Sequence, residues 1–578
     1  MKRRYFSLLL SGIMAMSLVA CGSSDAENIS ELEDDSAEET EEEGEETVEE
    51  ETEAEETVEE ETIEEEVDSS VAQELTFVVP SEPDGIDPGV TNNSFAQYVL
   101  QNCFEGLVTY DSSGSIVPGN AESWDISDDG LVYTFHLRDG LKWSDGTDLT
   151  AEDYVYAYQR VLIPETTAQY VSMFTDYIVN AQEYYDGTAT EEELGIQALD
   201  DQTLEITLIQ PTSFFIDLVS MWCFDPVQEE TVEENGDRWT ASADTYISNG
   251  PFKMEEISLG EGYVLVKNEN YWDADNVTLD KITLRIIADN ATALTAYESG
   301  EVDGIRSIST ADYARLKADN AGIQSVSSYG TVYYNINCSA EPYDDPLVRK
   351  ALNLAIDRQS IIENVVQIDA EPAYSFLAPG YYVDGVDITE GRGTYGLSET
   401  ADVEAAQEAL AEAGYPDGEG FPTMQLSYYS DDTVKKVVEA LAEMFETNLG
   451  IEVEIKSNDW AIFYESVQAG DYEVAAMGWS ADYLNPMSFL PLFKTGDSTN
   501  TAFYSNSEYD ELVEQVMAET DASVAAELTM EADAIASEDY CCLPLYYKTN
   551  DFLMKDYVSG YYMLSNGSLY FKDTVINE

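Results

Sequence analysis

The body of the chain contains short runs of apolar or alternating residues that are typical of β-strands. Residues 74–80 (ELTFVVP) are mostly apolar, and residues 203–210 (TLEITLIQ) alternate apolar with polar positions. Residues 131–146 alternate in the same way around Asp139-Gly140 and Asp145-Gly146, and this pattern predicts a hairpin.

The predicted helices carry their own start and stop signals. Thr150 can cap the free amides of a helix whose third position is Asp153. Further along, Gly450 is placed to end a helix with one apolar face, and the strand-like residues 451–455 follow it. That face consists of Val434, Val438, Leu441 and Phe445. Helices and strands therefore alternate, which predicts a mixed α/β fold.

The first twenty residues follow a different pattern. Basic residues 2–4 precede an apolar run of about 16 residues, which is short of the ~20 needed to span a bilayer. This is the layout of an export signal. Residues 18–21 (LVAC) resemble the bacterial lipobox, whose cysteine receives a lipid. We therefore expect a lipoprotein signal peptide at residues 1–20 and lipid attachment at Cys21. An ordinary signal peptide and an uncleaved anchor are the alternatives.

An acidic segment separates this start from the body. Residues 21–72 are dense in Asp and Glu, contain no Lys or Arg, and repeat EETVEEET at Glu45 and Glu55. Like charges with few apolar side chains cannot bury enough surface to offset the entropy of ordering. The segment is predicted to be a disordered spacer behind the lipid anchor. A calcium buffer is the alternative, although the glycine spacing of an EF-hand loop is missing.

The charge balance limits the partners of the body. The whole chain has a net charge of −92, and most of this charge lies beyond the acidic spacer. So strong a negative field argues against nucleic acid and anionic membrane surfaces as ligands. The field would favour cationic solutes weakly, but an adaptation to solubility or high salt is the preferred interpretation.

Residues for catalysis and metal binding are scarce. The chain has one histidine, His136, which leaves little for zinc catalysis or a His-based triad. After Cys21 an odd number of cysteines follows without metal-site spacing: Cys103, Cys223, Cys338, Cys541 and Cys542. These cysteines are expected to be mostly buried thiols. No cofactor, metal site or enzyme activity is expected.

Several blocks of the body resemble the oligopeptide- and dipeptide-binding proteins of ABC importers, which are bacterial extracellular solute-binding proteins of the peptide- and nickel-binding family. In chain order the blocks are SEPDGIDP at Ser81, CFEGLVTYDSSGSIVPGNAESW at Cys103, YTFHLRDGLKWSDGTDLTAEDYVYAYQR at Tyr133, SNGPFK at Ser248, YYNINCSAEPYDDPLVRKALNLAIDR at Tyr333 and GWSADYLNPMSFL at Gly478. The resemblance implies a substrate-binding lipoprotein on the extracellular face of the cell membrane, or on the periplasmic side. Such a protein captures short peptides and delivers them to the membrane subunits of an ABC permease.

The same resemblance implies the fold. It is an α/β fold of the type II periplasmic-binding-protein kind, with two lobes that close around the ligand and an extra third domain. Carried over, the ranges are 73–104, 245–330 and 546–578 for the first lobe, 105–244 for the extra domain and 331–545 for the second lobe. Crossing segments near residues 330 and 545 are expected to form a hinge, and a monomer is expected.

The resemblance also places a peptide site between the lobes. An extended peptide offers one amide and one carbonyl per residue, which strands can satisfy whatever the peptide's sequence. The family's strand partners correspond to Asn92 to Ser94 and to Gly478 to Ser480. Asp482 matches the aspartate that binds the α-amino group of the peptide. A helix cap or an internal salt bridge is the alternative role of Asp482.

Aromatic residues are expected to line the side-chain pockets of this site. Trp460 and Trp479 match family tryptophans with that role, and an indole supplies broad apolar contact plus one N–H donor. Tyr333 matches a family tyrosine near the peptide, and Tyr483 is included because it follows Asp482. Core packing is the alternative for the aromatic residues.

The chain departs from well-known family members in two places. Ala476 stands where they carry an arginine that helps to bind the peptide carboxylate, and Gly330 and Ser480 stand where they carry a cysteine pair. The sequence therefore names no group that binds the peptide C-terminus, and a preference for cationic peptides stays a hypothesis. A peptide sensor or pheromone receptor without import is one alternative function. A family member that binds a non-peptide solute is the other.

Overall fold

The computed structural model describes residues 71–306, 308–383 and 385–578, which belong to one compact unit. The predicted signal peptide, Cys21 and nearly all of the acidic spacer lie outside the described residues. Within the described residues, no helix is long and apolar enough to cross a bilayer. The fold is mixed α/β, as the sequence predicts.

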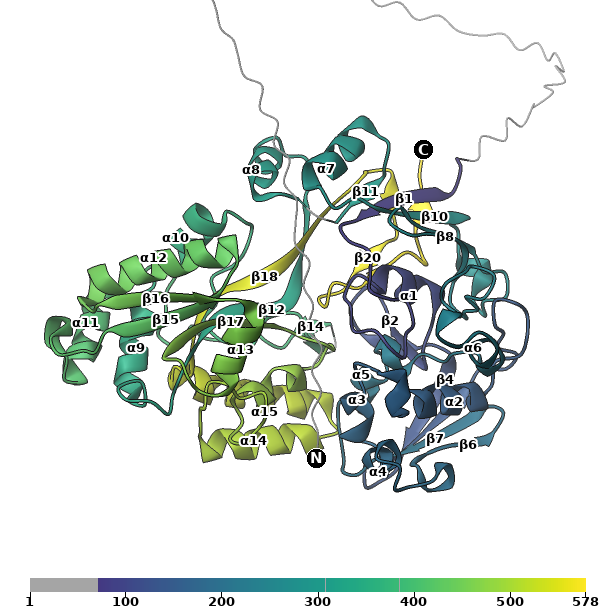
Figure 1. Ribbon diagram of the computed structural model, residues 1–578, viewed down its shortest axis with the longest axis horizontal. Coiled ribbons are helices and arrows are strands. Elements are labelled where there is room, and N and C mark those ends of the chain that lie inside the picture. The colour runs from purple at the N-terminus through teal and green to yellow at the C-terminus, as the bar shows by residue number, and fades with distance from the viewer. Residues whose placement is uncertain (1–70, 307, 384) are drawn as a thin grey trace, which may run out of the picture. The chain divides into compact units, whose positions relative to one another are not determined.

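One ten-stranded sheet runs through the body (Figure 1). Its longest strands, β12 and β18, lie next to each other and pair antiparallel. Strands from the range predicted for the second lobe lie on one side of this pair, and strands from the first lobe lie on the other. In sheet order the strands are β16 (Val453–Asn458), β15 (Met424–Tyr429), β17 (Val474–Ser480), β12 (Gln324–Ile336), β18 (Cys542–Met554), β11 (Gly304–Ile305), β1 (Glu74–Val79), β10 (Lys281–Ile286), β9 (Gly262–Lys267) and β8 (Phe252–Ser258).

The pairing of β12 with β18 is irregular where the two strands cross from one side of the sheet to the other. Thr331 pairs with Tyr547, but the register shifts between Ser327 and Thr331 and again after Val332. Tyr329 has a φ of 42°, a left-handed conformation that is uncommon for a residue with a side chain. The irregular segment coincides with the crossing expected near residue 330. The hinge and the predicted lobe boundaries stay predictions.

A separate four-stranded sheet lies within the range predicted for the extra domain. Its strands are β4 (Ala121–Ile126), β5 (Val132–Leu137), β7 (Thr203–Thr207) and β6 (Ile196–Asp200), in that order. Helix α2 (Ala151–Val161) packs against β6 and β7. The amide of Thr150 donates to the Asp153 carboxylate at 2.8 Å, which confirms the predicted start of this helix.

The hairpin predicted over residues 131–146 is wrong in its first half. Strand β5 ends before Asp139-Gly140 and pairs with β4 and β7 instead of with the residues that follow it. Asp145-Gly146 does close a short hairpin, with a bridge between Lys142 and Asp148. The alternating pattern identified a strand, but its partners lie elsewhere in the sequence.

The second-lobe range contains a strand–helix–strand unit. Helix α12 (Asp432–Leu449) connects the parallel strands β15 and β16 and packs on both. The predicted apolar face is confirmed, since Val438, Leu441 and Phe445 are buried and Val434 packs half-buried against the same core. Gly450, with a φ of 70°, ends the helix as expected.

The other described helices and strands are shorter or lie at the edges of this framework. The helices are α1 (Gln97–Cys103), α3 (Ser172–Thr175), α4 (Ala181–Tyr185), α5 (Phe215–Leu218), α6 (Glu229–Asn235), α7 (Asn290–Ser299), α8 (Thr310–Ala318), α9 (Pro346–Leu354), α10 (Arg358–Ser360), α11 (Val403–Glu412), α13 (Trp460–Gln468), α14 (Ser507–Ala518) and α15 (Ala522–Glu538). The two-stranded pairs are β2 (Val108–Tyr110) with β3 (Ile116–Pro118), β13 (Tyr382–Val383) with β14 (Val386–Asp387), β19 (Val558–Ser559) with β22 (Val575–Ile576), and β20 (Tyr562–Met563) with β21 (Leu569–Tyr570).

The described cysteines are all free thiols. Cys103, Cys223, Cys541 and Cys542 are buried, and Cys338 is half-buried. Adjacent Cys541 and Cys542 form no bridge with each other. This agrees with the expectation that most of the cysteines are buried thiols.

Candidate functional site

Asp482 follows the end of β17 and has an unpaired carboxylate. Its backbone amide donates to Ser488 Oγ at 3.2 Å. Within the described part of the chain, its carboxylate has no hydrogen bond and no ion pair. Water reaches the side chain, yet protein surrounds it on most sides, and this desolvation raises the pKa of Asp482 to about 6. The carboxylate is therefore an anion in a poorly solvated place without a cation beside it.

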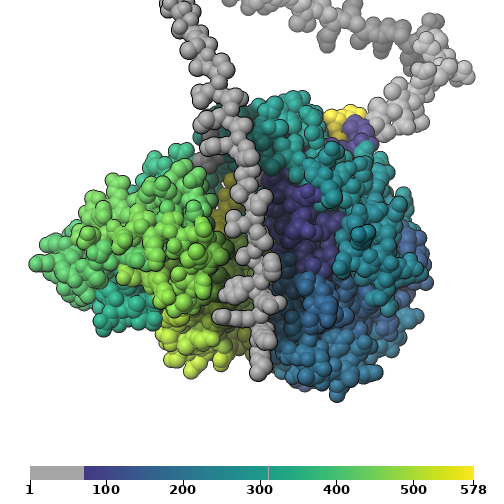
Figure 2. All heavy atoms as spheres, in the orientation of Figure 1, coloured from purple at the N-terminus to yellow at the C-terminus, as the bar shows by residue number. Residues whose placement is uncertain are grey.

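Residues of the range predicted for the extra domain lie near Asp482. Burial raises the pKa of the Tyr170 phenol, and the negative charge of Asp482 adds to this effect. The pKa of the Cys223 thiol is raised by burial and, more weakly, by Asp225 and Asp482. Asp482 therefore lies near the range predicted for the extra domain. In Figure 2 the green residues of the range predicted for the second lobe and the blue residues of the range predicted for the extra domain occupy the two sides of the view.

Tyr170 is also linked, through Trp222, to the loop that contains Asn92 and Ser94. The ring of Tyr170 packs edge-on against Trp222, with 6.0 Å between ring centroids. The Trp222 indole N–H then donates to the carbonyl of Thr91 at 2.9 Å. Trp222, which packs against Tyr170 near Asp482, is therefore hydrogen-bonded to the residue before Asn92.

Asn92 and Ser94 are exposed, but they lie in the loop before α1 and not in a strand. The Asn93 amide donates to Thr91 Oγ1 at 3.0 Å, and the Phe95 amide donates to Asn93 Oδ1 at 2.9 Å. These local bonds hold the loop before α1. Pairing of this loop with a peptide stays a prediction.

Gly478 to Ser480 form the end of β17, and one edge of this strand end is open. On its other edge, β17 pairs with β12 in continuous register from Val474, opposite Ile336, to Ser480, opposite Gly330. On the open side, pairing with β15 stops at Ala475. Within the described residues, β17 has no strand partner on this side beyond Ala475. An open strand edge presents amides and carbonyls that an extended peptide can pair with.

Trp460 lies at a small aromatic pocket beside this edge. The pocket has a volume of about 170 Å³, and Trp460 is 54% exposed. The Trp460 ring stacks on Tyr464, with 5.3 Å between centroids, and meets Tyr429 edge-on at 5.1 Å. Other residues of the lining are Val332, Tyr334, Ala476, Gly478, Tyr546 and Lys548.

Trp479 does not line this pocket. Its side chain is half-buried, and its indole N–H lies 3.4 Å from Ser488 Oγ. Ser488 Oγ thus lies between the indole of Trp479 and the amide of Asp482. This arrangement keeps Trp479 close to Asp482.

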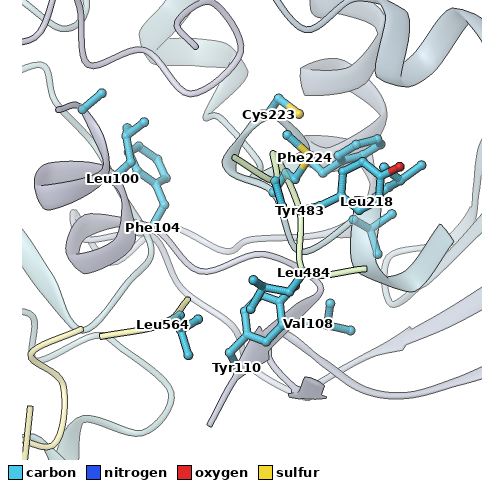
Figure 3. Packing of buried hydrophobic residues seen from close by; sticks show 14 of the residues in the cluster. Leu100, Phe104, Val108, Tyr110, Leu218, Cys223, Phe224, Tyr483, Leu484 and Leu564 are labelled. Atoms are coloured by element: carbon cyan, nitrogen blue, oxygen red, sulfur yellow. The ribbon is translucent and has the colours of Figure 1, made fainter. Parts of the chain in front are cut away.

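Tyr333 and Tyr483 are buried in the core. Tyr333 is 2% exposed, and its ring lies 6.1 Å from that of Phe493. Tyr483 is 6% exposed and stacks on Phe214 of the extra domain, with 5.7 Å between centroids. Figure 3 shows Tyr483 beside Cys223 and Phe224, and Leu484 beside Val108 and Tyr110. Both tyrosines pack as core residues here, which was the alternative to ligand contact.

The structure shows the surroundings of the residues that depart from the family pattern, namely Ala476 and the pair Gly330 and Ser480. Ala476 is buried at 2% exposure. Gly330 and Ser480 pair directly across β12 and β17. Lys548 of β18 reaches this pair, and its Nζ donates to Ser480 Oγ at 2.9 Å. Sequence reasoning missed Lys548, although the position of a lysine in a predicted crossing strand of so acidic a chain could have drawn attention to it.

Comparison with known proteins places the chain among bacterial solute-binding proteins. Residues 115–501 match the sequence profile of the bacterial extracellular solute-binding proteins, family 5, middle region. The oligopeptide-binding protein OppA of Bacillus subtilis is 32% identical over 88% of this chain and 93% of its own length. The unliganded open form of MppA, a periplasmic murein tripeptide binding protein, has 32% identity and a TM-score of 0.78, and covers 88% of this chain and 98% of its own. Haemophilus influenzae OppA in complex with RPPGFSPFR has 31% identity and a TM-score of 0.67, and covers 88% and 100%.

Proposed function

The chain belongs to the bacterial extracellular solute-binding proteins of family 5, and we propose that it captures short peptides outside the cell and delivers them to an ABC oligopeptide importer. The family consists of solute-binding proteins and not of enzymes. The peptide-bound relative supports peptides as the ligand class for this chain.

The observation that carries this proposal is the unpaired carboxylate of Asp482 beside the open edge of β17. A free peptide has a cationic α-amino group at one end and an amide and a carbonyl at every residue. The carboxylate of Asp482 suits the first of these groups, and the strand edge from Gly478 to Ser480 suits the others. A charge-assisted hydrogen bond in such a place contributes about 1.5–3 kcal/mol to binding.

The remaining predicted residues have supporting roles in this proposal. Trp460 offers an apolar wall for a ligand side chain, and Trp479 lies close to the amino-group site. The loop with Asn92 and Ser94 lies on the opposite wall and would meet the other edge of the peptide when the lobes close. Tyr333 and Tyr483 would act from the core, by holding the strands and the segment that carry Asp482.

The proposal includes an anchor at the membrane. Cys21 would carry the lipid, and the acidic spacer would keep the body at a distance from the bilayer while it meets the permease. The support is the layout of the first 21 residues, since this segment lies outside the described residues. Labelling of the protein with a radioactive fatty acid, in the wild type and in Cys21→Ala, tests the anchor; label in the variant would contradict it.

Native mass spectrometry of the full-length protein after gentle purification tests the function. A ladder of bound masses that matches mixed short peptides is expected, and Asp482→Asn should lose most of it. Asp128→Asn is the matched control, because Asp128 is exposed in a loop of the extra domain. A single non-peptide mass would overturn the ligand class, and a ladder unchanged in Asp482→Asn would overturn the role of Asp482.

A further inference from the structure

Lys548 is a lysine without a carboxylate partner in a protein rich in carboxylates. Its Nζ donates to Ser480 Oγ, and no Asp or Glu of the described residues lies within ion-pair distance of it. An ammonium group has three donors, so two remain for other partners. The side chain is half-buried, and desolvation lowers the pKa of Lys548. A cation in this setting gains free energy when an anion arrives.

Gly330 leaves the space through which the Lys548 side chain runs. A Cβ at residue 330 would lie 3.1 Å from Lys548 Cδ and 2.9 Å from both Ser480 Oγ and the carbonyl oxygen of Trp479. These separations are shorter than ordinary contacts, so a side chain at 330 would displace its neighbours. The course of the lysine from β18 past Gly330 to Ser480 therefore depends on the glycine.

The Lys548 side chain lines the aromatic pocket beside Trp460. Among the described residues that line this pocket, Lys548 is the only charged one. Rings of Tyr334, Tyr429 and Trp460 provide apolar walls, and Gly478 of the open strand edge forms part of the rim. The volume of about 170 Å³ is small for a whole ligand, yet it equals several water molecules of about 30 Å³ each. It suits one side chain or one chain end.

We propose that Lys548 makes this pocket a carboxylate subsite, which selects ligands that direct an acidic group into it. The inference rests on the proposed function, because it takes the open edge of β17 as the path of the peptide. The acidic group is either an Asp or Glu side chain of the peptide or its C-terminal carboxylate. Local charge at the pocket thus opposes the weak preference for cations that the overall charge of −92 would give.

Binding of a matched peptide series tests the subsite. The series consists of alanine tetrapeptides with Glu or Gln at each position in turn, and of tetra-alanine as free acid or C-terminal amide. Isothermal titration is made with the full-length wild type, with Lys548→Met and with Lys436→Met. Lys436 is an exposed lysine on α12, the helix that contributes Thr433 and Val434 to the same pocket, and it does not line the pocket itself.

In the wild type, at least one pair is expected to differ by about tenfold or more in Kd, with the acid bound more tightly. The difference should vanish in Lys548→Met and persist in Lys436→Met. A Glu-over-Gln difference identifies a side chain as the source, and an acid-over-amide difference identifies the C-terminus. Equal binding within every pair, or a difference that survives in Lys548→Met, would overturn the subsite alone. No binding of any peptide by the wild type would overturn the proposed function together with it.

Two further variants distinguish a loss of the lysine's charge from a loss of folded structure. Lys548→Arg keeps the positive charge and should retain discrimination between acid and neutral partners. Gly330→Ala should displace the lysine and reduce the discrimination between acidic and neutral peptides. The affinity for a peptide without an extra acidic group should fall less than the affinity for one with such a group. A loss of discrimination in Lys548→Arg with an unchanged thermal midpoint would contradict the role of charge.

Discussion

Asp87 and Asp482 are both aspartates that follow strands of the large sheet, but their surroundings are opposite: Asp87 is buried, and Asp482 is exposed to water on one side. Asp87 accepts two hydrogen bonds from Arg160, at 3.0 and 2.6 Å, and one from the Trp239 indole at 2.8 Å. Asp482 accepts none from the described residues, and its pKa is raised to about 6 by desolvation. The first carboxylate joins the loop after β1 to helix α2. The second remains available for a group from outside the chain.

This difference separates a structural charge from a binding charge. A buried carboxylate that is fully hydrogen-bonded fixes the position of its partners, and its removal leaves them unpaired. A carboxylate without partners lowers the stability of the free protein and gains its partner only from a ligand. Sequence alone does not distinguish the two, because both are single aspartates in loops.

Asp87→Asn should have the largest effect, and the effect is on stability. The change leaves Arg160 buried without its anion, and loss of one partner of a buried pair costs about 3–5 kcal/mol. Denaturant unfolding followed by circular dichroism measures this cost. The control is Asp148→Asn, whose pair with Lys142 is on the surface and should contribute less than about 1 kcal/mol. Equal unfolding midpoints of the two variants would show that Asp87 is not structural.

Asp482→Asn should have the opposite result, with binding lost and stability kept. The variant loses a charge-assisted hydrogen bond to the α-amino group, so the affinity for a short peptide falls by about 10- to 100-fold. Its thermal midpoint should equal or exceed that of the wild type, because a poorly solvated anion has been removed. Titration calorimetry and thermal denaturation measure the two effects. A lower midpoint together with intact binding would reverse the assignment of roles.

The pH dependence of binding should follow the carboxyl group of Asp482. With a pKa raised to about 6, the group is ionised at pH 7.5 and mostly protonated at pH 5. The attraction for an ammonium group is therefore present above pH 6 and is lost as pH falls below it, so affinity should drop about tenfold between pH 7.5 and 5. An N-acetylated peptide lacks the amine and serves as the control. A drop of the same size with the acetylated peptide would point to another group.

Trp460→Ala should have the smallest effect on binding. The ring forms one wall of a pocket that has other aromatic walls, so a loss of about three- to tenfold in affinity is expected for a peptide with an apolar side chain. Replacement of Tyr464, which stacks on Trp460 but does not line the pocket, should cost less affinity and serves as a comparison. An effect of Trp460→Ala as large as that of Asp482→Asn would make the pocket, and not the amino-group site, the main source of affinity.

Local features of the fold could be predicted from the sequence because they depend on neighbouring residues. Thr150 and Asp153 form the start of α2 within one turn of helix, and Gly450 ends α12 through its own backbone conformation. The hairpin after β5 could not be predicted in the same way. Its strand pairs with β7, which lies far along the chain, and an alternating pattern does not say which partner a strand takes.

The candidate site was predictable in position but not in energetics. The block around Asp482 located the residue, but the absence of a partner for its carboxylate depends on contacts between distant segments. Burial of Tyr333 and Tyr483 depends on Phe493 and Phe214, which the sequence does not place beside them. Lys548 became visible only through the register of β12, β17 and β18, which brings residues 330, 480 and 548 together.

The exposed ring of Trp460 also gives the pocket an optical signal of its own. An indole in contact with water emits at longer wavelength than one enclosed by apolar groups, and Trp460 is the most exposed tryptophan beside the open edge of β17. A ligand that fills the pocket would exclude water from the ring and shift its emission to the blue, while a carboxylate drawn to Lys548 would alter the field across it. Occupancy of the pocket is thus expected to change the part of the intrinsic fluorescence that comes from Trp460, one of seven tryptophans, without any attached dye.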